Sequence, residues 1–206
     1  MTNSNKENTN NSSTGKDFNN KTIKVSNQTP DRTSKALDLA REGQLQKAEK
    51  LYREMINNGT KDHLVYENLA VLCALKGDIN EMIDLLNRSI QIQPNQPDVY
   101  MDLGISFQAK SNFKAAIVLF QKAIDMNPSY PEAYNNLGIS FQREKNLIMA
   151  ISSYQQAIKL KPNYPEAHNN LGVAFRQQGK VADAINSYQR ATKLKPEYSE
   201  AHNNLG

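Results

Sequence analysis

A block of 34 residues, running from Pro131 to Tyr164, recurs along this sequence without a gap. Further copies occupy residues 97–130 and 165–198, and a less regular copy occupies residues 63–96. A repeat of this length is one supersecondary unit that packs only on its neighbours, so chain length does not indicate how many globular domains there are. The period therefore predicts one stack of repeats.

Residue types recur at fixed places within each copy: aromatic at place 4, Leu-Gly at 7 and 8, aromatic at 11, Ala at 20, aromatic at 24, Ala at 27 and Pro at 32. In residues 131–164 these are Tyr134, Leu137, Gly138, Phe141, Ala150, Tyr154, Ala157 and Pro162. This pattern resembles the tetratricopeptide repeat (TPR) family. The resemblance implies an all-α fold, a right-handed superhelical solenoid of antiparallel helix pairs.

The same register divides the whole chain. We expect residues 1–28 to be a disordered tail rich in Asn and Ser, because they contain too few large apolar residues to form a core. Residues 29–62 keep the helical spacing but lack the early aromatic and the Leu-Gly, which predicts a degenerate N-terminal capping repeat. Repeats follow at 63–96, 97–130, 131–164 and 165–198. Residues 199–206 begin a further, truncated repeat, so we expect the chain to be a fragment.

The glycines and prolines have structural places in this register, which leaves none for a phosphate-binding loop. Glycines at place 15 are predicted to end first helices in the left-handed conformation, namely Gly43, Gly77 and Gly179. Glycines at place 8 are predicted to lie where two helices approach closely: Gly104, Gly138, Gly172 and Gly206. Prolines at place 32 are expected to stop second helices, and those at place 1 to begin first helices.

Charge and cysteine content exclude several function classes. The net charge is +4, but acidic residues lie in the first turns of first helices and lysines at the ends of second helices, as helix dipoles favour. We therefore expect no nucleic-acid partner. No run of about 20 apolar residues is present, so no membrane partner is expected. A single cysteine excludes an internal disulfide framework, and without a secretory signal the predicted location is cytoplasmic.

No set of residues predicts catalysis, a cofactor or a metal. His168 and His202 occupy the same place in successive repeats, so about 10 Å should separate them, too far for two ligands of one ion. Because they stand where other repeats have tyrosine, we interpret them as packing residues. Cys73 stands where other repeats have Phe and is interpreted as a core residue. The chain as given is predicted not to be an enzyme, although it could be part of a larger one.

One set of polar residues, at place 6 of the first helices, has no packing explanation in the sequence. The set comprises Asn68, Asp102, Asn136, Asn170 and Asn204. TPR superhelices line their concave groove with this helix, and the TPR arms of O-linked N-acetylglucosamine transferases carry an asparagine ladder at the matching place. The resemblance implies that these five residues bind peptide. Asparagine is also abundant throughout this chain, so duplication of a neutral residue remains an alternative.

Other TPR proteins bind a chaperone's C-terminal carboxylate with lysine and arginine in the groove. Here place 5 carries Glu67, Met101, Asn135, Asn169 and Asn203, so the cations are missing and we reject that clamp. The resemblance implies a protein-interaction scaffold that holds a peptide segment of an unidentified protein in the concave groove. The alternative is the substrate-recognition arm of a larger glycosyltransferase, of the O-linked N-acetylglucosamine type, whose catalytic domain is absent here.

Overall fold

The computed structural model describes residues 30–206, and its secondary structure over that range consists of α-helices without strands. The predicted tail, residues 1–28, lies outside the described residues. The chain forms two compact units, the first ending at Pro94 and the second running from Asn95 to Gly206.

The first unit contains two helix pairs. Consecutive helices pack on one another, so α3 contacts both α2 and α4, and α4 contacts α5. Their bounds are α2 (Pro30–Arg41), α3 (Leu45–Asn57), α4 (His63–Lys76) and α5 (Ile79–Ile92). The first pair falls in the predicted capping repeat and the second in the 63–96 repeat.

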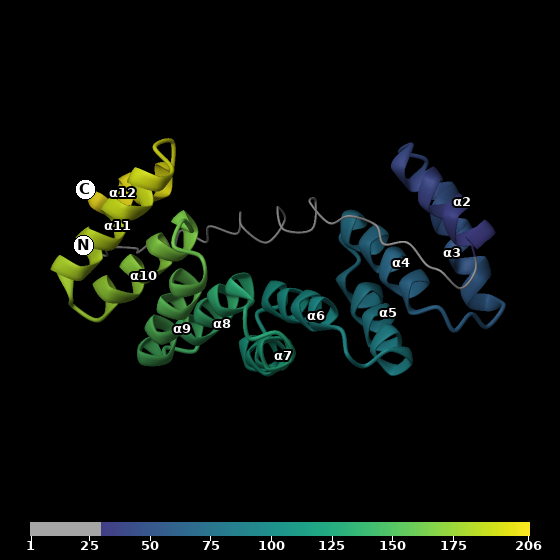
Figure 1. Ribbon diagram of the computed structural model, residues 1–206, viewed down its shortest axis with the longest axis horizontal. Coiled ribbons are helices and arrows are strands. Elements are labelled where there is room, and N and C mark those ends of the chain that lie inside the picture. The colour runs from purple at the N-terminus through teal and green to yellow at the C-terminus, as the bar shows by residue number, and fades with distance from the viewer. Residues whose placement is uncertain (1–29) are drawn as a thin grey trace, which may run out of the picture. The chain divides into compact units, whose positions relative to one another are not determined.

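The second unit contains three helix pairs and one further helix (Figure 1). Each second helix packs on the first helix of its own repeat and on the first helix of the next. The bounds are α6 (Pro97–Ala109), α7 (Phe113–Met126), α8 (Pro131–Arg143), α9 (Leu147–Leu160), α10 (Pro165–Gln177), α11 (Val181–Leu194) and α12 (Ser199–Leu205). Together the two units confirm the predicted all-α fold of consecutive helix pairs.

Helix starts follow two rules that depend on position in the repeat. First helices α6, α8 and α10 begin with proline, whose missing N–H costs nothing in the first turn. Second helices α5, α7 and α9 are preceded by an Asp or Asn that caps the helix, accepting a hydrogen bond from a backbone N–H three residues on. Asn146, for example, accepts from the Met149 N–H at 3.2 Å.

The first helices end in a left-handed residue at place 15, whether or not glycine stands there. Gly77 and Gly179 have φ of 80° and 79°, as the sequence predicts. Ser111 and Lys145 occupy the same place in the two intervening repeats and adopt φ of 56° and 62°. Side chains rarely take this conformation, so the short turn before the next helix imposes it on them.

The core of each pair in the second unit is built on contact between a glycine and a ring. A Cβ added to Gly138 would lie 2.6 Å from the Tyr154 ring, and one added to Gly104 would lie 2.4 Å from the Phe120 ring. The close approach predicted at place 8 is therefore confirmed at Gly104, Gly138 and Gly172. It is wrong at Gly206, where an added Cβ would meet nothing within 4 Å, because no helix among the described residues packs against that position.

In the 63–96 repeat the glycine and the ring are replaced together. Ala70 stands at place 8 and Leu86 at place 24, and both side chains are buried. Leu86 removes the ring from the place opposite Ala70. In the capping repeat, by contrast, the buried Ala36 and the buried Tyr52 stand at places 8 and 24, so that helix pair accommodates both a Cβ and a ring.

Candidate functional site

The place-6 residues lie on the first helices, and in the second unit three of them are half-buried. Asn136 is on α8, Asn170 on α10 and Asn204 on α12, at positions partly open to solvent. Asp102 on α6 and Asn68 on α4 are buried, with 8% and 1% of their surface exposed. The five predicted residues therefore differ in how much of each side chain a ligand could reach.

Two of these asparagines bond to the preceding repeat. Asn170 Nδ2 donates to Asn135 Oδ1 at 3.0 Å, and Asn204 Nδ2 donates to Asn169 Oδ1 at the same distance. The acceptors occupy place 5 of the repeat before and are buried. Place 6 thus has a packing role that the sequence analysis did not anticipate, because each bond joins two first helices.

Asn136 is different because its expected acceptor is missing. The place-5 residue of the preceding repeat is Met101, whose thioether accepts hydrogen bonds only weakly. Within residues 30–206, the Asn136 side-chain amide has no hydrogen-bond partner, although its backbone carbonyl accepts from Gln108 Nε2 at 2.9 Å. Its two N–H donors and its oxygen are all available to a ligand.

The place-4 side chains join each repeat to the loop before it. His168 Nε2 lies 3.1 Å from the Pro162 carbonyl oxygen, and His202 Nε2 lies 2.8 Å from that of Pro196, so in each ring Nε2 carries the proton that is donated. The Tyr66 hydroxyl donates to the matching Thr60 carbonyl at 3.3 Å. Burial lowers the pKa of His168. These contacts give both histidines the packing role expected of them.

Cys73 belongs to a charged network in the first unit. Its thiol donates to Glu81 Oε2 at 3.4 Å, and burial, followed by the Glu81 carboxylate, raises its pKa to about 12. Arg53 binds Glu81 through two contacts of 2.5 and 2.9 Å and also pairs with Glu49, which Lys76 contacts in turn. A buried thiol that stays protonated is a poor nucleophile, in keeping with the predicted core role.

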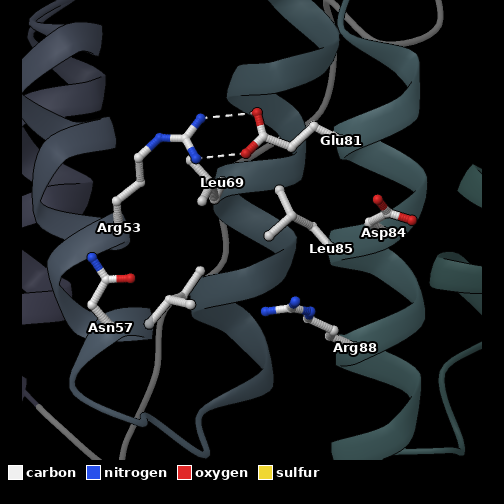
Figure 2. A pocket seen from close by; sticks show the side chains of 8 residues that line it. Arg53, Asn57, Leu69, Glu81, Asp84, Leu85 and Arg88 are labelled. Carbon is white, nitrogen blue, oxygen red and sulfur yellow. Dashed lines mark hydrogen bonds and ion pairs between the residues drawn. The ribbon is translucent and has the colours of Figure 1, made fainter.

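A pocket of about 380 Å³ opens beside this network, between α3 and α5 (Figure 2). Leu69 of α4 and Leu85 of α5 line it, and the Arg53–Glu81 pair closes one end. Sequence reasoning missed this pocket because its walls come from two second helices that are separated by a whole helix. The only sequence signal is Arg53, because the later repeats have Asn or Gln at that place.

Metal-binding clusters and membrane-spanning helices are both absent from residues 30–206. No group of three His, Cys, Asp or Glu side chains in that range could hold a metal ion. No helix in the same range has the length and apolar content needed to cross a membrane.

Comparison with known proteins identifies the repeats. A family model described as TPR repeat matches residues 107–144, 149–176 and 174–206, and one described as tetratricopeptide repeat matches residues 64–96. No curated protein sequence matched the chain.

Three solved structures illustrate the similarity in fold. A crystal structure of MamA has a TM-score of 0.75 and 21% identity, and the match covers 80% of this chain and 96% of MamA. MamA from Desulfovibrio magneticus RS-1 has a TM-score of 0.75 and 17% identity, with 82% and 97% covered. YrrB, described as a TPR protein with an unusual peptide-binding site, has a TM-score of 0.76 and 18% identity, with 93% and 96% covered. The matches of the two family models together span more than half of the sequence, and this chain belongs to the tetratricopeptide repeat family.

Proposed function

We propose that this protein is an interaction scaffold that holds an extended segment of a partner protein against the first helices of its repeats. The proposed contact residues are those at place 6: Asn68, Asp102, Asn136, Asn170 and Asn204. The observation that carries the proposal is the Asn136 amide, which is half-buried on α8 and has no hydrogen-bond partner in the described chain. The fold similarity to YrrB, a TPR protein with a peptide-binding site, supports the same class of function.

Asn136 is the strongest contact in this proposal because its whole amide can bind a peptide backbone. A side-chain amide both donates and accepts hydrogen bonds, so it can bond to the N–H and C=O groups of an extended peptide backbone. Such bonds do not depend on the side chains of the bound peptide. Asn170 and Asn204 each donate one N–H to a residue of the preceding repeat, so only the second N–H and the amide oxygen are left to bind a peptide. The contacts of Asn170 and Asn204 are therefore weaker and add to that of Asn136.

The geometry sets the length of the segment. Successive first helices packed about 10 Å apart place the three half-buried asparagines over about 20 Å, which an extended peptide covers in about six residues. Each net hydrogen bond contributes about 0.5 to 1.5 kcal/mol, so three asparagines provide less than the roughly 8 kcal/mol of micromolar binding. Side-chain contacts of the partner must supply the difference.

The experiment compares two asparagines that differ in whether their amide is already bonded. A peptide selected from a random twelve-residue library would be titrated against the wild type, Asn136→Ala and Asn170→Ala. We expect Asn136→Ala to weaken binding about threefold to tenfold while the melting temperature stays unchanged. Asn170→Ala is expected to lower stability by about 1 kcal/mol, because it leaves the buried Asn135 amide without its bond. Unchanged binding in Asn136→Ala would refute the role of this residue.

The alternative function is the recognition arm of a larger enzyme, such as an O-linked N-acetylglucosamine transferase. The observation that favours it is the asparagine at place 6 in three successive repeats, at Asn136, Asn170 and Asn204. The same first-helix face would then bind the enzyme's protein substrate. The coding sequence that follows Gly206 tests this alternative, because a glycosyltransferase domain there would support it and a stop codon would refute it.

A further inference from the structure

The pocket between α3 and α5 lies on the second helices of the first unit and is separate from the place-6 asparagines of the second unit. We propose that it binds a short internal segment of a partner protein in which one large aliphatic side chain and one Glu or Asp side chain project from the same face. This is a second recognition site, independent of the one proposed above.

The floor and size of the pocket fit an aliphatic side chain. Leu69 and Leu85 are buried and Ile56 is half-buried, and these three residues form the apolar part of the lining, whereas the other five lining residues are polar or charged. The volume of about 380 Å³ is at the small end of the range for ligand sites, about 300 to 1,000 Å³. One side chain and an adjoining polar group would occupy such a space.

One end of the pocket is fixed by charges that already have partners. Arg53 is held by Glu81 on α5 and by Glu49 on its own helix, and Arg53 keeps the pKa of Glu81 below its ordinary value. Figure 2 shows the Arg53 guanidinium directed across the pocket at Glu81. Because the charges of Arg53 and Glu81 neutralise each other, this pair forms a rigid wall of the pocket and attracts a charged ligand only weakly.

The other end of the pocket carries a cation that has no partner within the described part of the chain. Arg88 is exposed and forms no ion pair or hydrogen bond with any residue from 30 to 206. The Asn57 side chain, which also lines the pocket, is likewise exposed, and its amide forms no hydrogen bond within the same range. In Figure 2 the Arg88 side chain points from α5 toward α3, whereas the Asp84 carboxylate points away from α3. A guanidinium and an amide at the edge of an apolar floor match a carboxylate, which accepts from both.

The charges are not required for stacking the repeats. At the junction between the 97–130 and 131–164 repeats, the places of Arg53, Glu81 and Arg88 are taken by three uncharged residues, Gln121, Met149 and Gln156. Those repeats stack without the three charges. The junction between the 131–164 and 165–198 repeats keeps two of them, as Asp183 and Arg190, but has Gln155 in place of Arg53, so within residues 30–206 the full set of three occurs only at this pocket. Because Asp84 also lines the pocket, a single carboxylate suits the site better than a run of acidic residues.

The test uses a peptide that carries only the two proposed features. Acetyl-Ser-Leu-Ser-Glu-Ser-amide places Leu and Glu two residues apart, on one face of an extended chain. It would be titrated into the full chain labelled at Ile and Leu methyl groups. We expect chemical-shift changes at the methyl groups of Ile56, Leu69 and Leu85. The same peptide with Gln in place of Glu should bind about tenfold more weakly, since it loses the charge-assisted hydrogen bonds.

Two arginine variants complete the experiment. Arg88→Gln should weaken binding of the Glu peptide about tenfold and leave the urea midpoint unchanged, because the side chain is exposed and unpaired within residues 30–206. Arg190→Gln is the matched control, since Arg190 is an exposed arginine at the same place in the 165–198 repeat. Equal binding of the Glu and Gln peptides would overturn the proposal. An equal effect of the two arginine variants, or no shift of these methyl groups at millimolar peptide, would also overturn it.

Discussion

Replacing Gly138 by alanine tests the contact between a first helix and the ring of its partner helix. The added Cβ would lie 2.6 Å from Tyr154 Cε1 and 2.7 Å from Cδ1, closer than carbon atoms can approach. The Tyr154 ring is fully buried, so it has no free space into which it can move. The expected result is a loss of stability, although alanine is the better helix former.

The magnitude is a difference between two opposing effects. Overpacking a filled core costs about 1 to 3 kcal/mol. Replacing glycine by alanine inside a helix recovers about 0.5 to 1 kcal/mol. Gly138→Ala should therefore destabilise the protein by up to about 2.5 kcal/mol, and Gly138→Leu by more.

The sign of this effect should reverse when the ring is removed. In a Tyr154→Leu background the Cβ no longer meets an aromatic ring, so Gly138→Ala should stabilise that variant by about 0.5 to 1 kcal/mol. Tyr154→Leu also breaks the hydrogen bond to Gln142, but this loss is common to both proteins that carry the substitution and cancels in the cycle. The first unit already contains the expected combination, Ala70 with Leu86.

Urea unfolding of the four proteins, followed by circular dichroism, gives the coupling energy between the two sites. We expect about 1 to 3 kcal/mol. The control is Ala70→Gly, which should destabilise by about 0.5 to 1 kcal/mol because no ring faces that position. If Gly138→Ala costs the same in the wild type and in the Tyr154→Leu background, the contact with the ring is not what selects glycine at this place.

Two further predictions concern two buried tyrosines and a half-buried histidine. Tyr154→Phe should lower the free energy of unfolding by about 1 kcal/mol, because the Tyr154 hydroxyl donates to Gln142 Oε1 at 2.7 Å. Tyr188→Phe should leave the free energy of unfolding unchanged or raise it, because the buried Tyr188 hydroxyl has no partner within residues 30–206. Arg176 stands there in place of the glutamine. Equal losses in urea unfolding would contradict this account. Burial lowers the pKa of His168 below 6.5, so as the pH falls this histidine is protonated in the unfolded chain before it is protonated in the folded one. The stability that the neutral His168 contributes is therefore present above about pH 6.5 and is lost as the pH falls toward the folded-state pKa. His168→Tyr should make stability less dependent on pH in that window, and an unchanged pH profile of the urea midpoint would count against it.

Residue type at fixed places was enough to predict the helix pairs. Pro131 and Pro165 begin helices, Gly77 and Gly179 end them, and Gly138 faces a ring, as the sequence indicates. Each of these depends on a backbone property of one residue type, which a single sequence displays directly. Ser111 and Lys145 could not be predicted as left-handed from their own identity, because the turn imposes that conformation on whatever residue stands there.

The candidate sites were less predictable because they depend on contacts between repeats. The bond from Asn170 to Asn135 joins residues 35 apart, so it requires the register of two neighbouring helices as well as the residue types. The sequence analysis placed Asn68, Asp102, Asn136, Asn170 and Asn204 in one class. The structure separates Asn136 from Asn170 and Asn204 by their partners, and Met101 is the residue responsible. The pocket at Arg88 depends in the same way on the spacing of two second helices.

The bond between place 6 of one repeat and place 5 of the one before has a consequence for how such a chain can change in length. A repeat with asparagine at both places offers an acceptor to the following copy and a donor to the preceding one, so its two ends are complementary. Recombination that inserts or deletes a whole copy within residues 131–206 would restore the same bond at the new junction. The junction at Met101 lacks this interchangeability, because a copy placed after it leaves an amide unbonded. Each whole copy added on the C-terminal side of α6 therefore brings one further bonded junction, and the single unbonded amide stays in whichever repeat follows Met101.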